Sequence, residues 1–309
     1  MKVVIVGGVA GGATAAARIR RLDERSEIVV FERSGFISYA NCGLPYYIGG
    51  VIEDPEDLTL QTPESFWQRF RIHMKVHHEV TAIHPDRKTV SVKNLESGEE
   101  FEENYDKLLL SPGAKPLWPK LPGMESRKLF TLRTVEDTFR IKEFVNQNKP
   151  KSAVMVGGGF IGLEVAENLR HLGLDVTIVQ RPKQLMNPFD ADMASFIHAE
   201  MRKHGVKLAL GYSVEGFAER DGGVDVLLKD SEMFERIRKA DVINKSTIAR
   251  LYQISEEDVI SIVYFPNAKA IKATIVRPLP SGALGERDVY GAQQHAPLML
   301  LPVDDAICG

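Results

Sequence analysis

The stretch that decides the fold is KSAVMVGGGFIGLEVAENLRHLG, residues 151–173. A short apolar run leads into a glycine-rich turn, and small and apolar residues at helical spacing follow it. Gly157, Gly159 and Gly162 stand in G-x-G-x-x-G register, which is typical of the strand, turn and helix of a Rossmann unit that binds a dinucleotide. The candidate cofactor-binding residues of this turn are Gly157, Gly159, Phe160, Ile161 and Gly162.

The strand after this helix is expected to end beside the bound dinucleotide. Its run DVTIVQ closes on Gln180, and Arg181 follows. A NAD-selective site usually has an acidic residue at this place, because a carboxylate accepts hydrogen bonds from the ribose 2′-hydroxyl. Gln180 has no charge that would repel a 2′-phosphate, and Arg181 can pair with one. These two candidate residues therefore favour NADPH, or the use of both nicotinamide cofactors.

A related pattern occurs in KVVIVGGVAGG, residues 2–12, where a buried strand again enters a glycine turn. Gly7 stands where the chain must bend tightly, and Gly12 where the next helix must approach the strand. Val9 replaces the usual middle glycine. The candidate cofactor-binding residues of this turn are Gly7, Gly8, Ala10, Gly11 and Gly12.

Two further segments complete this first unit. The strand EIVVFER brings Glu32 and Arg33 to its end, where an acidic residue can bind the ribose hydroxyls of an adenine dinucleotide. The run YDKLLLSPGAKP, residues 105–116, predicts a strand that ends at Ser111 and Gly113. Two nucleotide-binding units joined in this way can place a flavin against a nicotinamide, and hydride transfer between them is the expected reaction.

Length and composition fit an ordinary globular protein of two domains or a little more. The chain has 309 residues, of which 44% are hydrophobic and 26% charged, with a net charge of −3. This charge gives no electrostatic footprint for nucleic acid or an anionic membrane, and no apolar run suits a transmembrane helix or a signal peptide. Two cysteines, Cys42 and Cys308, do not make a disulfide framework, so we expect a cytoplasmic protein in a reducing compartment.

Cys42 lies in ISYANCGLPYY, residues 37–47, and three roles are open to it. It is a buried structural thiol, half of a redox pair, or a nucleophile that works alone. A working thiol must be a thiolate, which the N-terminus of a nearby helix favours. Whether a helix begins beside Cys42 is a question for the structure.

Four motifs together carry a resemblance to a known family: VVIVGGVAGGATAAARIRRLD, SYANCGLPYYIGG, LLLSPGAKP and VMVGGGFIGLEVAENL. From residue 1 to about residue 228 the chain resembles the pyridine nucleotide–disulfide oxidoreductases. Within them it is most similar to the single-cysteine branch of coenzyme A-disulfide reductases and NADH oxidases. The resemblance implies FAD on the first glycine turn, NAD(P)H on the second, and Cys42 as the catalytic thiol beside the flavin.

The resemblance also bears on how Cys42 reacts. Two-cysteine relatives have a partner five residues away, where this chain has Ile37 and Tyr47. Cys42 would then cycle through a mixed disulfide with a substrate thiol, or through a sulfenic acid. Peroxide- and oxygen-reducing relatives carry a histidine in the first glycine turn, and Ala10 stands there in this chain. That difference favours thiol–disulfide chemistry.

Coenzyme A is the small-molecule partner that the resemblance implies, with no nucleic acid and no membrane. Arginine suits its phosphates through charge-assisted hydrogen bonds, and the alternative for such arginines is a solvated basic stripe. By position, the substrate-binding residues would be Thr14, Arg18, Arg21, Ser38 and Asn41.

Beyond residue 228 the sequence changes character. Complete relatives continue with a second flavin-binding strand and an interface domain that forms a homodimer, and neither is recognisable here. Residues 231–309 instead resemble the C-terminal part of a small uncharacterised domain found near proteins of acyclic terpene utilisation. We expect helices over 231–252 with a cap at Ser255, and strands at 259–265, 270–278 and 296–303.

Two explanations are open for this junction: a fusion of two genes, or a remodelled protein in which the tail supplies missing strands. Two interpretations are open for Gln293, Gln294 and His295: a site in the tail, or loop and structural residues, which a histidine beside amides more often is. His77 and His78 lie on a strand-like stretch without metal-ligand partners at useful spacing, and no metal site is expected.

The fold class expected is α/β, with two three-layer Rossmann-like units, the first incomplete, and a small α+β segment. The expected domains are an FAD-binding part at 1–115, a crossover linker and helix at 116–150, an NAD(P)-binding domain at 151–230, and the tail at 231–309. The expected function is a flavin-dependent NAD(P)H:disulfide oxidoreductase. The alternatives are an NADH oxidase that cycles through a cysteine sulfenic acid, or a non-catalytic protein whose tail mediates binding.

Overall fold

The chain forms two compact α/β units, each of which is described by itself. The computed structural model describes residues 1–220 and 222–230 and, beyond them, the backbone of five strands. The first unit contains Met1–Pro116 and Arg133–Gln147, and the second contains Leu117–Leu132 and Asn148–Asp305. Within the described part of the chain, no helix is both long and apolar enough to cross a bilayer.

A parallel four-stranded sheet forms the centre of the first unit. Its order is β3 (His73–Lys75), β2 (Glu27–Phe31), β1 (Lys2–Val6) and β7 (Lys107–Leu110). Val4 is in register with Val29 on one side and with Leu108 on the other. The two strands expected around the first glycine turn therefore lie next to each other, and the strand that precedes Ser111 pairs with them.

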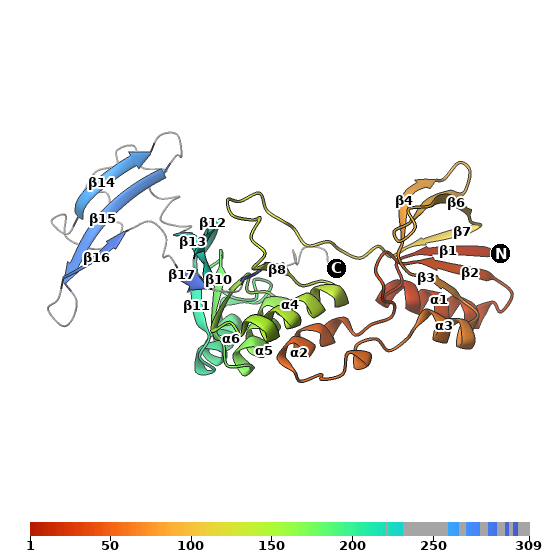
Figure 1. Ribbon diagram of the computed structural model, residues 1–309, viewed down its shortest axis with the longest axis horizontal. Helices are drawn as coiled ribbons and strands as arrows, with labels where there is room; N and C mark the ends of the chain where they lie inside the picture. Colours follow the sequence, from red (N-terminus) through yellow and green to blue (C-terminus); the bar gives the residue numbers. More distant parts are fainter. Residues whose placement is uncertain are drawn as a thin grey trace. The chain divides into compact units, whose positions relative to one another are not determined.

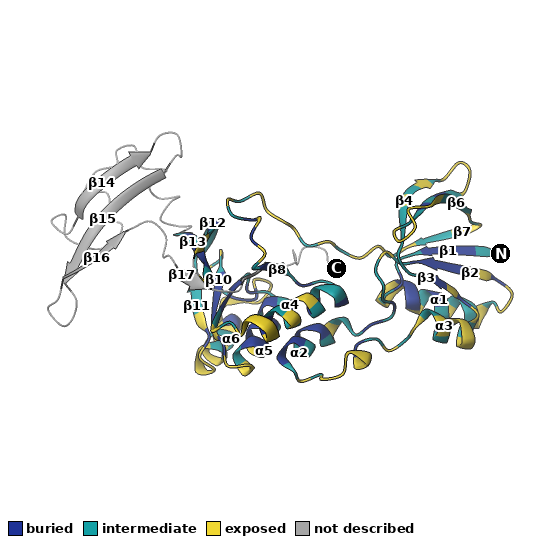
Figure 2. Cartoon of the chain, in the orientation of Figure 1, coloured by how far each residue is buried: buried dark blue, intermediate teal, exposed yellow. Residues whose placement is uncertain are grey.

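Both faces of this sheet are covered, which gives three layers (Figure 1). Helices α1 (Ala10–Leu22) and α3 (Pro63–Phe70) pack on one face. The antiparallel meander of β4 (His78–His84), β5 (Thr89–Asn94) and β6 (Glu100–Asn104) covers the other. Alternate strand residues take part in two separate clusters: Val3, Ile5, Ile28 and Val30 with the helices, and Val4, Val29 and Phe31 with the meander. Figure 2 shows the central strands buried and the outer faces of the helices exposed.

Short elements between β2 and α3 carry the cysteine. They are the 3-10 turn η1 (Asn41–Gly43), helix α2 (Leu44–Gly49) and the 3-10 turn η2 (Pro55–Asp57). Helix α4 (Val135–Asn148) belongs almost entirely to the same unit, although the sequence places it in a linker at 116–150.

The second unit repeats the parallel arrangement. Its sheet has the order β11 (Lys207–Leu210), β10 (Asp175–Gln180), β9 (Ser152–Val156), β18 (Met299–Leu301) and β8 (Leu129–Thr131). Helix α5 (Phe160–His171) connects β9 to β10, and α6 (Ala191–Lys203) connects β10 to β11. The hairpin of β12 (Tyr212–Arg220) and β13 (Gly223–Asp230) packs against this sheet through Phe217, Val226 and Leu228.

The tail contributes strands at the expected places. The strands β14 (Val259–Phe265) and β15 (Ala270–Pro278) confirm two of them, and β16 (Leu284–Asp288) pairs with β15. The third expected strand contains β18, which pairs in parallel with both β8 and β9. In addition, β17 (Gln294–Ala296) pairs with β13. These pairings fit the explanation in which the tail supplies strands, whereas the helices expected at 231–252 and the cap at Ser255 lie outside the described residues.

A glycine-to-alanine change tests the strand–helix contact of the first unit. A Cβ at Gly12 would lie 1.8 Å from the carbonyl oxygen of Gly7, which is backbone and cannot move aside. Gly12→Ala should therefore lower the free energy of unfolding by about 3 kcal/mol or more. Urea denaturation measures this free energy of unfolding, and Gly98→Ala is the control. Gly98 has φ +76° but open space around it, so its cost should be only about 1 kcal/mol. Equal losses in both variants would contradict the close contact.

Candidate functional site

The first glycine turn, residues 7–12, presses the start of α1 against the end of β1. Gly7 has φ +98°, a conformation that favours glycine, and its N–H donates to the carbonyl of Phe31 at 2.8 Å. The carbonyl of Gly7 in turn lies where a side chain on Gly12 would begin. The turn therefore exposes bare backbone at the helix N-terminus, the arrangement that accepts a phosphate group.

Glu32 lies beside this turn, as the sequence predicts. Its Oε2 accepts the N–H of Gly8 at 2.7 Å, and its Oε1 accepts the N–H and the hydroxyl of Ser34 at 2.8 and 2.9 Å. Oε2 retains a second lone pair, so the carboxylate can still accept a hydrogen bond from a ribose hydroxyl. Arg33 is exposed, and its guanidinium pairs with Glu79 on β4 at 3.5 Å.

Ser111 and Gly113 close the other side of the first turn. The N–H of Ser111 donates to Val6 at 2.8 Å, and a Cβ on Gly11 would lie 2.4 Å from the Ser111 hydroxyl oxygen. Gly113 has φ +71° and lies beside the Arg133 guanidinium. Ala10 and Gly11 are exposed. Any larger side chain at these glycines would fill the space beside the first turn. Open space of this kind is what residues that hold a dinucleotide require.

The second glycine turn, residues 157–162, has the same geometry in the second unit. Gly157 has φ +112°, and a Cβ on Gly162 would lie 2.2 Å from the carbonyl oxygen of Gly157. The Oε1 atom of Gln180 accepts the N–H of Gly158 at 3.1 Å, so Gln180 takes the place that Glu32 has in the first unit. Arg181 is exposed and makes no hydrogen bond or ion pair within the described residues.

The start of α5 is built partly from exposed apolar surface. Gly159 caps the helix in extended conformation, Phe160 is 57% exposed, and Ile161 is half-buried. The Phe160 ring packs edge-on against Phe189 with 6.4 Å between centroids. Sequence reasoning did not single out Glu164 on this helix, although burial raises the pKa of its carboxyl, with Glu167 adding to the effect. An acidic residue inside an apolar helical run was the available signal.

Cys42 is exposed and lies in η1, and α2 begins two residues later at Leu44. Because the thiol is exposed, the interpretation as a buried structural cysteine is wrong. Residue 37 is a buried isoleucine and residue 47 a tyrosine, so no second cysteine lies at the positions where two-cysteine relatives have one. Ser38 has φ +46°, and its N–H donates to the carbonyl of Gly8 at 3.0 Å, which connects the cysteine loop to the first turn.

The residues expected to bind substrate lie on two elements. Ser38 and Asn41 share the loop of Cys42. Thr14, Arg18 and Arg21 are exposed along α1, and no hydrogen bond in the described part of the chain connects them to that loop.

Neither Arg18 nor Arg21 has a hydrogen bond or ion pair among the residues described. Arg20 differs from both, because its guanidinium donates to the carbonyls of Phe70 and Glu24 at 2.8 Å. Arg20 is therefore structural, whereas its two neighbours are free to meet an anionic ligand.

A cluster of titratable groups lies behind the cysteine loop, and sequence reasoning missed it. Burial raises the pKa of Tyr39 to about 12; the cation of Arg133 opposes this rise, and the carboxylates of Glu32, Glu136 and Asp137 add to it. Apart from Glu32, sequence motifs did not single these residues out, because they come from segments far apart in the sequence.

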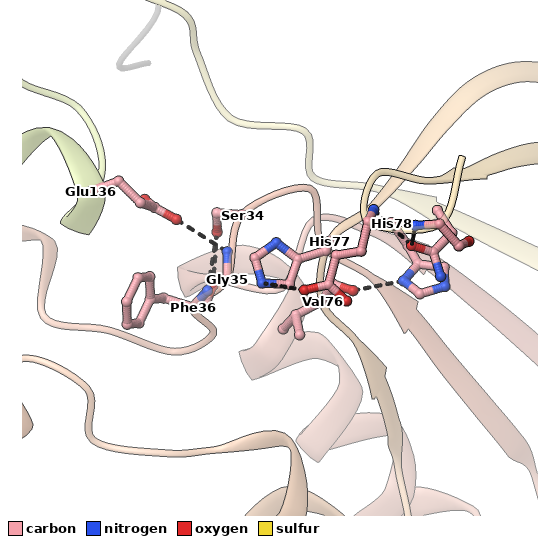
Figure 3. Close-up of polar contacts among 10 residues, drawn as sticks. Ser34, Gly35, Phe36, Val76, His77, His78 and Glu136 are labelled. Carbon is pink, nitrogen blue, oxygen red and sulfur yellow. Dashed lines mark hydrogen bonds and ion pairs between the residues drawn. The ribbon is translucent and has the colours of Figure 1, made fainter. Parts of the chain in front are cut away.

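The histidines on β4 and the preceding turn make local contacts (Figure 3). The ring of His77 lies against Gly35, and Nδ1 of His78 is 2.6 Å from the carbonyl oxygen of Val76. Among the described residues, no group of histidine, cysteine, aspartate and glutamate side chains could hold a metal ion. Cys308 and the side chains of Gln293, Gln294 and His295 lie outside the described residues.

Comparisons with known proteins agree with this geometry. A family model described as pyridine nucleotide-disulphide oxidoreductase matches residues 1–243, and the model of a domain of unknown function, DUF4387, matches residues 223–302. The chain is 45% identical over 214 residues to a coenzyme A disulfide reductase of Staphylococcus aureus strain MRSA252. That alignment covers 69% of this chain and 48% of the relative, so the chain spans about half the length of the curated relatives it matches.

Two solved structures are similar over most of the chain. The reduced CoADR-RHD of Bacillus anthracis gives a TM-score of 0.76 at 37% identity and covers 98% of this chain and 43% of that one. The water-forming NADH oxidase of Lactobacillus brevis, bound to NADH, gives a TM-score of 0.68 at 35% identity and covers 74% and 50%.

A pH measurement tests the loop that follows β10. The N–H of Leu185 donates to Nε2 of His198 at 2.9 Å, and Leu185 packs against Gly158 of the second turn. Burial, with a smaller contribution from Arg202, lowers the pKa of His198 below 6.5. The unfolded chain therefore binds more protons between these pKa values, and stability should fall as the pH drops below about 6.5. Thermal unfolding between about pH 5 and pH 8 measures this fall.

The matched variants are His198→Gln and His171→Gln. The first should flatten the fall, because an amide oxygen can accept the same N–H without titrating. The second changes an exposed histidine at the end of α5 and should leave the loss of stability at low pH unchanged. An unchanged pH profile in His198→Gln would assign the effect to another group.

Proposed function

The chain belongs to the pyridine nucleotide–disulphide oxidoreductase family, and we propose that it is a flavin-dependent NAD(P)H:disulfide oxidoreductase with coenzyme A disulfide as its substrate. The observation that supports this most is the exposed Cys42 in a loop that is hydrogen-bonded to the first glycine turn. The names of the relatives add the substrate class.

The two glycine turns divide the cofactors between them in this proposal. The first turn, with Glu32 and Ser111, would hold FAD, and the second turn, with Gln180 and Arg181, would hold NAD(P)H. The bare backbone at both turns supports a dinucleotide at each, because a pyrophosphate needs that close approach. When bound, FAD supplies a two-electron relay between the nicotinamide and the thiol. Gln180 is uncharged, and Arg181 has no ion pair within the described residues. Both features favour NADPH, or the use of both nicotinamide cofactors.

Cys42 acts as the nucleophile. Its thiolate sulfur attacks one sulfur of the substrate disulfide; the substrate S–S bond breaks, a Cys42–substrate S–S bond forms, and one thiolate leaves and takes up a proton. Two electrons from NAD(P)H then break the mixed disulfide, which releases the second thiol and restores the Cys42 thiolate. Overall, NAD(P)H, a proton and one disulfide give NAD(P)⁺ and two thiols. An exposed thiol of this kind stays reduced in the cytosol, which is the compartment we infer.

Replacing the thiol tests this mechanism. Cys42→Ser in the FAD-reconstituted protein should lower NADPH-dependent reduction of coenzyme A disulfide by on the order of a thousandfold or more. Bleaching of the flavin band by NADPH should persist, because that step does not use the thiol. The long-wavelength thiolate–flavin absorbance of the unsubstituted protein should be absent. Thiol release measures the reduction of the disulfide, and visible spectra measure the flavin bleaching and the long-wavelength absorbance.

Two outcomes would contradict the proposal. If the protein cannot be reconstituted with FAD, the alternative of a non-catalytic protein whose tail mediates binding is favoured. NADPH oxidation that consumes oxygen, depends on Cys42 and ignores added disulfide would favour the oxidase that cycles through a sulfenic acid.

The arginines of α1 provide a test of the substrate. Arg18→Ala and Arg21→Ala should each raise KM for coenzyme A disulfide by about fivefold to tenfold with little change in kcat, since each removes a charge-assisted contact to phosphate. Pantethine, the disulfide without the phosphates, should show no such change. Arg25→Ala, at another exposed arginine, is the control. An unchanged KM for coenzyme A disulfide would indicate a solvated basic stripe instead, and an equal rise of KM for both disulfides would exclude a contact with the phosphates.

A further inference from the structure

Helix α4 presents a row of side chains to the segment that contains Cys42. The row consists of Arg133, Glu136, Phe139 and Lys142, which follow one another at intervals of three residues. Residues three apart on a helix are neighbours on its surface, and Arg133 lies just before the first helical residue. We call these four residues the α4 row, and residues 35–47 the cysteine segment.

Two members of the row hold the start of the cysteine segment. The Oε1 atom of Glu136 accepts the N–H of Gly35 at 3.1 Å (Figure 3). The Phe139 ring lies edge-on to Phe36, with 5.9 Å between centroids. The other carboxylate oxygen of Glu136 is buried without a hydrogen-bond partner among the described residues, so this side chain gives up water for the contact with Gly35.

Two members hold the end of the segment. Nζ of Lys142 donates to the carbonyl of Tyr47 and lies 4.4 Å from the centre of the Tyr47 ring. Phe139 packs against the same ring at 5.6 Å. The N–H of Gly50 also donates to the Tyr47 carbonyl, at 3.2 Å, and a cation at the last turn of a helix is favourable because the helix dipole is negative there. Lys142 is half-buried, and this burial lowers the pKa of its ammonium against the opposing charge of Glu53.

The remaining member reaches the middle of the segment. Nη1 of Arg133 donates to Oδ1 of Asn41 at 3.3 Å, and Asn41 is the residue before Cys42. The row therefore touches the cysteine segment before, beside and after Cys42, while the thiol itself stays exposed. The elements it holds are short, and a single helical turn is not stable without tertiary contacts.

We propose that the α4 row is a positioning device that fixes the orientation of Cys42 for attack on the substrate disulfide, with Lys142 and Arg133 as positioning residues. This inference rests on the proposed function, in which Cys42 is the nucleophile. Disulfide exchange needs the attacking sulfur to be aligned with the bond that breaks, so a loosely held loop spends less time in the reactive geometry.

Amide hydrogen exchange tests the positioning without any turnover. In Lys142→Met and Arg133→Met, amides of residues 35–47 should exchange about tenfold faster, while amides of β1 and β2 stay unchanged. Lys142→Arg keeps a donor and should restore protection. Lys149→Met makes the same chemical change at an exposed lysine just after α4 and should have no effect. Unchanged exchange at 35–47, or equal acceleration through β1 and β2, would overturn the inference.

A reactivity ratio links the positioning to chemistry. The rate of Cys42 with coenzyme A disulfide, divided by its rate with iodoacetamide, is measured by mass spectrometry on the full chain. A small alkylating agent accepts any exposed orientation of the thiol, whereas the disulfide does not, so Lys142→Met should lower the ratio about tenfold. An unchanged ratio would overturn the positioning role.

The two proposals fail in different ways. If Cys42 in the unsubstituted chain has no preference for coenzyme A disulfide over hydroxyethyl disulfide, the proposed substrate is wrong. The exchange result and the ratio measured with hydroxyethyl disulfide still decide whether the α4 row positions the thiol.

Discussion

The structure depends on a contact between two stretches of bare backbone, which occurs once in each unit. The α-carbon of Gly12 meets the carbonyl of Gly7, and the α-carbon of Gly162 meets the carbonyl of Gly157. Only glycine allows a helix to approach the end of its strand this closely. That approach places the helix N-terminus at the end of the strand and fixes the position of the next strand. It also leaves open the backbone that a pyrophosphate requires. The other candidate residues are arranged around these two points.

The same position carries a different charge in the two units. Glu32 directly follows β2 and Gln180 is the last residue of β10, and both accept the N–H of the second glycine of their turn. The carboxylate adds a negative charge beside the first turn and the amide adds none beside the second. An acid suits ribose hydroxyls and repels a 2′-phosphate, so the common geometry is compatible with different nucleotides. The proposed division of FAD and NAD(P)H between the two turns would give this difference a role.

Much of this architecture follows from local pattern. Apolar runs before glycine turns predicted β1 and β9, and alternating apolar residues predicted β14 and β15 with the bounds that are found. The position of α4 did not follow, because its amphipathic pattern says which face is buried and not which unit it packs against. Arg18 and Arg21 were singled out on α1 and Arg20 between them was not, and only Arg20 of the three donates to backbone carbonyls among the described residues. Contacts between distant segments decide such questions, and a single sequence contains no record of them.

The strand β18 has a consequence for how the chain acquires its fold. Met299 lies between Leu129 and Val154 in the sheet of the second unit, so β8 and β9 are joined only through a segment that is made much later. During synthesis both strands leave the ribosome with an open edge toward the missing neighbour. Such pairing over long sequence separations is slow, and open edges invite pairing with other chains. Translation of the region near residue 300 would thus set the moment at which this sheet closes, and a chaperone that shields β9 until then would raise the yield of native protein.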